Sequence, residues 1–244
     1  MKDYYSKDLA FIHDVGYGDF ALKSAPGILE ILRGNGISEG LVVDLGCGSG
    51  IWAEQLTRAG YQVLGIDISK AMIAIAKKRA PLARFQAGSL FKSRIPACNA
   101  VTCLGECINY LFDQTSEGAR LRRLFDRVYD ALAPGGVFVF DIAEPGQVAG
   151  GETVRGFNEG EDWVVLVEKR EDRKREMLSR RIICFRKAGD HYRRADETHR
   201  LRLYRARDIA RDLRRTGFRV RVMRGYGEHR LSKAHAAFVA RKLA

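Results

Sequence analysis

The sequence is poor in proline and has no long apolar run. Only 5 prolines occur among its 244 residues, and no apolar stretch approaches the roughly 20 residues that are needed to cross a bilayer. The N-terminus, Met1-Lys2-Asp3-Tyr4-Tyr5, carries charge and lacks the apolar segment of a signal peptide. With 46% hydrophobic residues, the chain is long enough to bury a full core. We therefore expect one soluble globular domain that has no contact with a membrane.

Cysteine is scarce and scattered. The 5 cysteines form an odd set without CxxC pairs, and no histidine accompanies them at metal-ligand spacing. They are Cys47, Cys98, Cys103, Cys107 and Cys184. This pattern predicts reduced thiols in the cytoplasm and no metal site.

Positive charge is confined to one part of the chain. Residues 1–154 hold 16 Lys and Arg against 17 Asp and Glu, whereas residues 155–244 hold 26 against 13. A negatively charged partner or substrate is one explanation of this excess. The other is the solvated face of a charged β-sheet, because acids are interleaved with the basic residues. The sequence leaves both open.

Strand-like and helix-like patterns alternate over the first 143 residues. A helix or cap is expected over residues 3–18, and a helix over residues 20–33. Short apolar runs then alternate with segments of helical periodicity. The expected strands cover residues 41–45, 62–67, 84–87, 100–104 and 137–141, and the helices cover residues 51–59, 70–79 and about 116–132. Strands separated by helices predict a parallel, doubly wound α/β sheet.

The pattern changes after Gly150-Gly151. Three segments without helical periodicity follow, at residues 162–170, 176–187 and 191–204. We interpret them as a three-stranded antiparallel insertion. A helix and two strands then return the chain to the core sheet. The predicted organisation is an N-terminal cap and core over residues 1–154, the insertion over residues 155–205, and the end of the core over residues 206–244.

A glycine-rich loop, Asp44-Leu45-Gly46-Cys47-Gly48-Ser49-Gly50, joins the first expected strand to a helix. Glycines allow a positive φ and let a ligand approach the main chain closely. The following helix presents free N–H groups and the positive end of its dipole. Asp67 ends the second strand, where an acidic side chain can accept two hydrogen bonds from ribose hydroxyls. These features predict a ligand that contains adenosine.

Two details argue against a dinucleotide. Ile51 occupies the last glycine position of the GxGxxG fingerprint, and Asp44 would repel a pyrophosphate but attract an ammonium group. Here the sequence resembles the class I S-adenosylmethionine-dependent methyltransferases, whose hallmark is a strand that ends in a (V/L)(D/E)xGxGxG loop. The resemblance covers about residues 38–142 and includes an LxPGG turn at residues 132–136. It implies a Rossmann-like, seven-stranded, mostly parallel sheet with S-adenosyl-L-methionine as cofactor.

The resemblance also assigns cofactor contacts. The methionyl and ribose parts would meet Gly46, Gly48, Asp44, Asp67, Leu104 and Glu106, with Asp44 near the amino group and Asp67 on the ribose hydroxyls. The adenine would meet Ile68, Met72, Gly88, Ser89 and Leu90.

The methyl acceptor must be positioned and, where needed, deprotonated. The candidate catalytic side chains are His13, Tyr17, Glu106 and His199. Three of them have plainer alternatives. Glu106 could orient the cofactor, His13 could be a capping residue, and His199 could be structural on a strand face.

Three functions follow from these observations. The first is a cytoplasmic enzyme, monomeric or homodimeric, that methylates an oxygen or nitrogen of a small molecule. Residues 155–205 would form a lid over this acceptor. A carboxylate or phosphate on the acceptor would suit the excess of basic residues. The second is an RNA-modifying enzyme, although no RNA-binding module is recognisable. The third is a protein that binds S-adenosylmethionine without catalysis. The Asp/Asn-Pro-Pro-Tyr/Phe motif of amino-methylating DNA enzymes is absent after residue 104.

Overall fold

The core of the protein is a seven-stranded sheet. A computed structural model describes residues 4–112, 117–149 and 152–243. Within these ranges the strand order is β10-β13-β5-β4-β1-β2-β3, and only β13 runs antiparallel to its neighbours. The strands are β1 (Leu41–Leu45), β2 (Gln62–Asp67), β3 (Arg84–Ala87), β4 (Cys98–Cys103), β5 (Leu132–Ala143), β10 (Arg219–Met223) and β13 (His235–Arg241). The predicted seven-stranded, mostly parallel sheet is confirmed.

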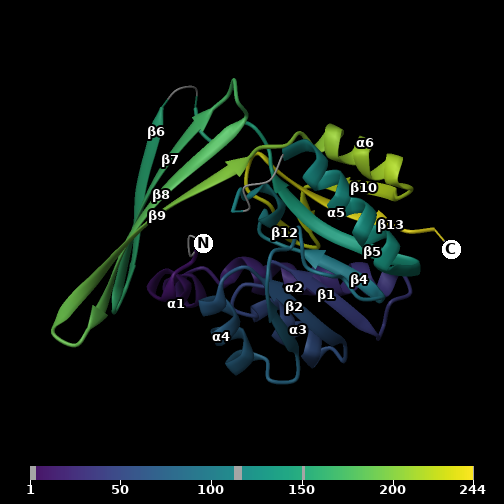
Figure 1. Cartoon of the computed structure of the whole chain (residues 1–244), viewed down its shortest axis with the longest axis horizontal. Helices are drawn as coiled ribbons and strands as arrows, with labels where there is room; N and C mark the ends of the chain where they lie inside the picture. The colour runs from purple at the N-terminus through teal and green to yellow at the C-terminus, as the bar shows by residue number, and fades with distance from the viewer. Residues whose placement is uncertain (1–3, 113–116, 150–151, 244) are drawn as a thin grey trace.

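Helices cover both faces of this sheet (Figure 1). They are α1 (Lys7–Gly16), α2 (Asp19–Gly34), α3 (Ile51–Arg58), α4 (Lys70–Arg79), the short η1 (Cys107–Asn109), α5 (Glu117–Ala131) and α6 (Ala206–Thr216). One apolar cluster joins Phe125 of α5 and Leu213 of α6 to the sheet. A second cluster joins Leu32 of α2 and Leu56 of α3 to the opposite face. The central strands are therefore apolar on both sides, as buried parallel strands are. No helix of the described ranges is long and apolar enough to span a membrane.

A separate four-stranded antiparallel sheet follows β5. Its strands are β6 (Thr153–Gly160), β7 (Trp163–Asp172), β8 (Met177–Ala188) and β9 (His191–Arg202), in that order. The prediction of three strands was wrong by one, because β6 is an edge strand whose residues are all exposed and show no apolar alternation. The short pair β11 (Gly225–Tyr226) and β12 (His229–Arg230) was not predicted either.

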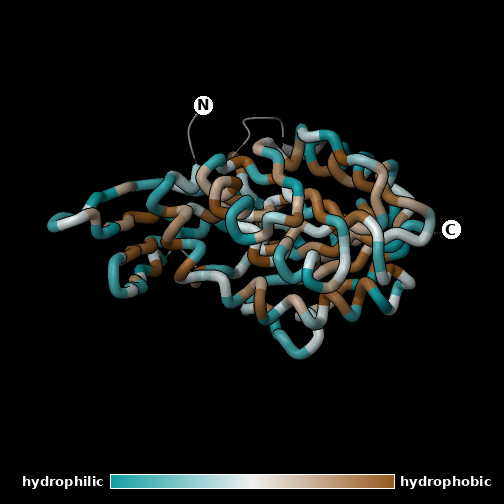
Figure 2. The backbone as a smooth tube through the Cα atoms, turned by 90° about the horizontal axis from the view of Figure 1, so that it is seen from below, coloured by the Kyte–Doolittle hydropathy of each residue, from teal (hydrophilic) through white to brown (hydrophobic). Residues whose placement is uncertain are grey.

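The four-stranded sheet extends from the core over α1 (Figure 1). Leu9 and Ile12 of α1 pack against Trp163 and Val165 of β7, which forms a small apolar cluster of its own. At the other end, Leu201 of β9 packs beside β5. Figure 2 shows that the turns farthest from the core are hydrophilic. The inner face of this sheet is thereby held over the carboxyl ends of the central strands.

Candidate active site

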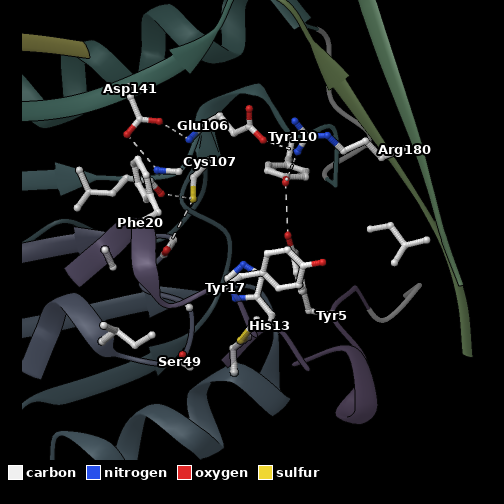
Figure 3. A pocket seen from close by; sticks show the side chains of 18 of the residues that line it. Tyr5, His13, Tyr17, Phe20, Ser49, Glu106, Cys107, Tyr110, Asp141 and Arg180 are labelled. Carbon is white, nitrogen blue, oxygen red and sulfur yellow. Dashed lines mark hydrogen bonds and ion pairs between the residues drawn. The ribbon is translucent and has the colours of Figure 1, made fainter. Parts of the chain in front are cut away.

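A cavity of about 1010 Å³ lies between the two sheets. The glycine loop after β1, the end of β2 and the segment after β4 line one side of it. The N-terminal segment and the inner faces of β7 and β8 line the other (Figure 3). Ligands of open α/β sheets bind at this position, outside the carboxyl ends of the strands.

The glycine loop has a backbone shape that other residues rarely adopt. Gly46, Gly48 and Gly50 have φ values of 76°, 53° and 80°. A Cβ at Gly46 would lie 2.5 Å from Sγ of Cys107, so a side chain there would collide as well as strain the backbone. The loop therefore leaves a bare main chain on the cavity wall.

Asp67 lies at the end of β2 and lines the cavity. It accepts hydrogen bonds from the amide of Gly48 (2.9 Å) and the amide of Ser69 (2.8 Å). Burial raises the pKa of Asp67, and these two amides partly oppose that effect. Each oxygen retains capacity for a further donor such as a ribose hydroxyl.

Asp44 is buried at the end of β1. Its Oδ1 accepts from Oγ1 of Thr102 (2.7 Å), which in turn accepts from the indole of Trp52 (3.1 Å). Burial raises the pKa of Asp44 to about 7. The hydrogen bond from Thr102 acts to lower this pKa, and the negative charge of Asp67 acts to raise it. The side chain is thus fixed in place and titrates near neutrality.

Glu106 stands in the left-handed region, with φ of 55°. Its backbone amide donates to Asp141 (2.6 Å), and its carboxylate is hydrogen bonded to Arg180 of β8 and to Nε2 of His235 (3.0 Å). Burial acts to raise the pKa of Glu106, but the Arg180 charge and the bonds from His235 and Arg180 outweigh it and hold the pKa at about 2. Glu106 is therefore ionised and joins the two sheets.

Tyr110 and Tyr5 extend this network toward the N-terminal segment (Figure 3). Arg180 donates to the Tyr110 hydroxyl (3.1 Å), which lies 3.4 Å from the Tyr5 hydroxyl. Burial raises the pKa of Tyr110 to about 12, although Arg180 opposes the shift. The amides of Tyr5 and Ser6 donate to Glu197 of β9, so the N-terminal segment is tied to the four-stranded sheet.

His13 and Tyr17 lie on the cavity wall of the N-terminal segment. Burial lowers the pKa of His13 to about 4, so its imidazole is neutral. The His13 Nδ1 atom is buried and has no hydrogen-bond partner among the described residues. The Tyr17 hydroxyl accepts from Asn158 of β6 (2.8 Å).

The structure brings most of the predicted site residues together. Of the predicted cofactor residues, those that line the cavity are Asp44, Gly46, Gly48, Asp67, Ile68, Met72, Ser89, Leu90, Leu104 and Glu106. Gly88 does not line it; its amide donates to the carbonyl of Asp67 (2.8 Å). Of the predicted catalytic residues, His13, Tyr17 and Glu106 line it. His199 is fully buried outside it and lies 2.8 Å from Glu197.

Arg180, His235, Asp141 and Lys169 were not predicted as site residues. Arg180 and His235 reach Glu106 from 74 and 129 positions away. No local motif marks them, so only the folded chain reveals their role.

A family model for a methyltransferase domain matches residues 42–136, which include the glycine loop, Asp67 and Glu106. This part of the chain is therefore a methyltransferase domain, and the whole chain has the fold of S-adenosylmethionine-dependent methyltransferases. S-adenosylmethionine is the cofactor of this family. The positive-φ glycines and the Asp67 carboxylate on one cavity wall fit that cofactor.

Two relatives with assigned methyltransferase activities in their names match parts of the chain. A ubiquinone biosynthesis O-methyltransferase of Alkalilimnicola ehrlichii is 33% identical over 106 residues, or 41% of this chain and 40% of the relative. A dTDP-3-amino-3,6-dideoxy-alpha-D-glucopyranose N,N-dimethyltransferase of Streptomyces fradiae is 28% identical over 62% of each chain. The chain therefore spans less than two thirds of the length of each relative.

Solved structures cover the chain more completely. An S-adenosylmethionine-dependent methyltransferase from Clostridium acetobutylicum has a TM-score of 0.82 and 21% identity, with 97% of this chain and 98% of that chain covered. The sugar N-methyltransferase KedS8 from Streptoalloteichus has a TM-score of 0.77 and 21% identity, with 100% and 94% covered. At this identity the likeness shows the fold alone. The shared fold includes the four-stranded sheet, since nearly the whole of both chains is matched.

Proposed function

We propose that the protein transfers the methyl group of S-adenosylmethionine to an oxygen or nitrogen of a small molecule. One observation carries the proposal: the cofactor loop and the inner face of the four-stranded sheet line the same cavity. The bound cofactor supplies the activated methyl group. The protein then has to orient the acceptor, exclude water and accommodate a proton.

In this proposal, Asp67 accepts hydrogen bonds from the ribose hydroxyls, and the bare main chain at Gly46 and Gly48 allows close approach. Ile68, Met72, Ser89 and Leu90 surround the adenine. Asp44 has one oxygen engaged by Thr102, which leaves the other for the cofactor ammonium. Gly88 holds the end of β2 in place through its amide rather than touching the cofactor.

Glu106 is proposed to position the methionine end of the cofactor. A carboxylate with a pKa of about 2, paired with Arg180 and His235, is a weak base at neutral pH. His13 is neutral and has an unpartnered nitrogen beside the cavity. With a pKa of about 4, His13 is also a weak base at neutral pH, and its neutral imidazole is proposed only to accept a hydrogen bond from the acceptor. We propose structural roles for Tyr17 and His199, which bind Asn158 and Glu197 of the four-stranded sheet.

Residues 155–205 are proposed to form the acceptor lid. Val165, Val167, Lys169 and Ile182 of this segment line the cavity together with Arg180. The apolar side chains would pack on the acceptor, and the cations would favour an acceptor that bears negative charge. In this proposal, residues 1–154 and 206–244 form the core that binds the cofactor.

The relatives favour a small acceptor over RNA. One relative is described as acting on an aminosugar nucleotide and another as an O-methyltransferase of ubiquinone biosynthesis. We rank the amino group of a sugar-like molecule first, because the Streptomyces relative is matched over 162 residues. A cytoplasmic location and a monomeric or dimeric state stay part of the proposal.

The proposal is tested by incubating the protein with S-adenosylmethionine and a panel of aminosugars, phenols, carboxylic acids and RNA. We expect S-adenosylhomocysteine and a product 14 mass units heavier from at least one acceptor class, as one CH₂ replaces a hydrogen. Activity only on RNA, falling steeply with added salt, would favour the RNA alternative. Tight cofactor binding without turnover of any acceptor would favour a non-catalytic binding protein.

A further inference from the structure

Two cations stand side by side on the inner face of the four-stranded sheet. Lys169 of β7 pairs in register with Arg180 of β8, and both line the cavity. Directly opposed residues of an antiparallel pair have Cβ atoms about 5 Å apart, and like charges in such positions destabilise the pair. An arrangement of this kind calls for a compensating negative charge.

Only part of that compensation is present in the described residues. The carboxylate of Glu106 is paired with Arg180 through Nη1, but Nε of Arg180 is buried and has no hydrogen-bond partner. A buried donor without a partner destabilises the folded protein. Among the described residues, Glu106 forms its ion pair with Arg180 and not with Lys169.

Lys169 is half-buried, and no ion pair or hydrogen bond joins its ammonium group to another described residue. Burial and the nearby Arg180 lower the pKa of Lys169, whereas Glu106 acts in the opposite direction. Two other basic residues of the four-stranded sheet do form ion pairs with acidic neighbours. Arg155 is 2.8 Å from Glu168, and Arg181 is 2.9 Å from Asp196.

The other carboxylates of the cavity are already engaged elsewhere. Asp141 accepts from two backbone amides and from the hydroxyl of Tyr226 (3.1 Å). Asp67 accepts from the glycine loop, and Asp44 from Thr102. The acids therefore lie along the core side of the cavity, and the positive charge of Lys169 is left uncompensated on the sheet side.

We propose that Lys169 Nζ and the guanidinium of Arg180 form a subsite for an anionic group of the methyl acceptor, a carboxylate or a phosphate. This inference rests on the proposed function and narrows its substrate class. An anion between the two cations would remove their repulsion and give Lys169 the counter-charge that Glu106 gives Arg180. The rest of the acceptor would then extend toward the segment after β4, where the methyl group is transferred.

The test is calorimetric titration of inorganic pyrophosphate and of malonate into the full-length protein, with and without S-adenosylhomocysteine. The variants are Lys169→Gln, Lys169→Arg and, as a matched control, Lys174→Gln in the exposed turn between β7 and β8. We expect one binding site in the wild type, weakened about tenfold or more by Lys169→Gln, since a charged hydrogen bond is lost. Lys169→Arg keeps the charge and stays within about threefold, and Lys174→Gln has no effect.

The relative affinities of the two probes assign the subsite to phosphate or to carboxylate. The inference is overturned if the wild type binds neither probe, if Lys169→Gln binds them as the wild type does, or if Lys174→Gln gives the larger loss. Binding of S-adenosylhomocysteine is read in the same titrations and is expected to be equal in all variants. Failure of the wild type to bind S-adenosylhomocysteine would count against the proposed function, whichever way the anion result falls.

Discussion

The two walls of the cavity differ in charge and in the way they are built. The acidic floor consists of Asp44, Asp67, Glu106 and Asp141, at or just after the ends of core strands. The basic roof consists of Lys169 and Arg180, on two neighbouring strands of the four-stranded sheet. A cationic cofactor suits the floor, and an anionic acceptor suits the roof. Under the proposed function, one cavity would separate its two ligands by the sign of their charge.

The largest effect is expected where floor and roof meet. Arg180→Met leaves the buried Glu106 carboxylate with His235 alone, and we expect the free energy of unfolding to fall by about 3 kcal/mol. Chemical denaturation measures this loss. The double variant Glu106→Gln with Arg180→Met should recover part of it, because the uncompensated charge is gone. Equal losses in the single and double variants would mean that the pair does not couple the two walls.

Removal of Asp67 tests the floor by itself. Asp67→Ala should weaken binding of S-adenosylhomocysteine roughly 10- to 100-fold, because hydrogen bonds to a charged group are lost. The matched control is Asp130→Ala on the exposed face of α5. Calorimetry compares the two variants. Unchanged cofactor affinity in Asp67→Ala would show that Asp67 does not bind the ribose hydroxyls.

The sequence alone could predict the cofactor side of the cavity but not the side formed by the four-stranded sheet. The glycine loop and Asp67 were predictable because their spacing along one strand, turn and helix is a local property of the chain. Lys169 and Arg180 were not, because their pairing depends on the register of β7 and β8 and on where that sheet packs. His199 illustrates the same limit, since its strand position could not tell the cavity from the buried contact with Glu197.

The pH dependence of cofactor binding separates Asp44 from the rest of the floor. Burial raises the pKa of Asp44 to about 7, so it is protonated below that pH in the ligand-free protein. If the ionised form binds the cofactor ammonium, affinity should be about tenfold lower at pH 6 than its plateau above pH 8. Asp44→Asn should bind more weakly at high pH and lose the dependence. An unaltered pH profile in that variant would assign the dependence to another group.

The raised pKa of Asp44 affects protein stability in the opposite direction: cofactor affinity should rise with pH, whereas the free energy of unfolding should fall. Because the folded pKa of Asp44 lies above its unfolded value, its contribution to stability is complete below the unfolded pKa and is lost as pH rises through 7. Thermal unfolding of the ligand-free protein from pH 5 to 8 should show a decline that Asp44→Asn reduces. A wild-type decline that persists in the variant would exclude Asp44 as its source.

The smallest effect is expected at the edge of the four-stranded sheet. Tyr17→Phe removes one hydrogen bond, from Asn158, at an exposed position. We expect a loss of about 0.5–1 kcal/mol in the free energy of unfolding and unchanged cofactor affinity. A large loss of cofactor affinity would instead indicate that Tyr17 contacts the cofactor.

The central claim is that cofactor and acceptor share one cavity between an acidic floor and a basic roof. A crystal structure of the protein with S-adenosylhomocysteine tests it most directly. The account predicts ribose hydroxyls on Asp67, the amino group beside Asp44, and the sulfur facing open space below Lys169 and Arg180. A sulfur turned away from the four-stranded sheet, or a cofactor bound outside this cavity, would contradict it.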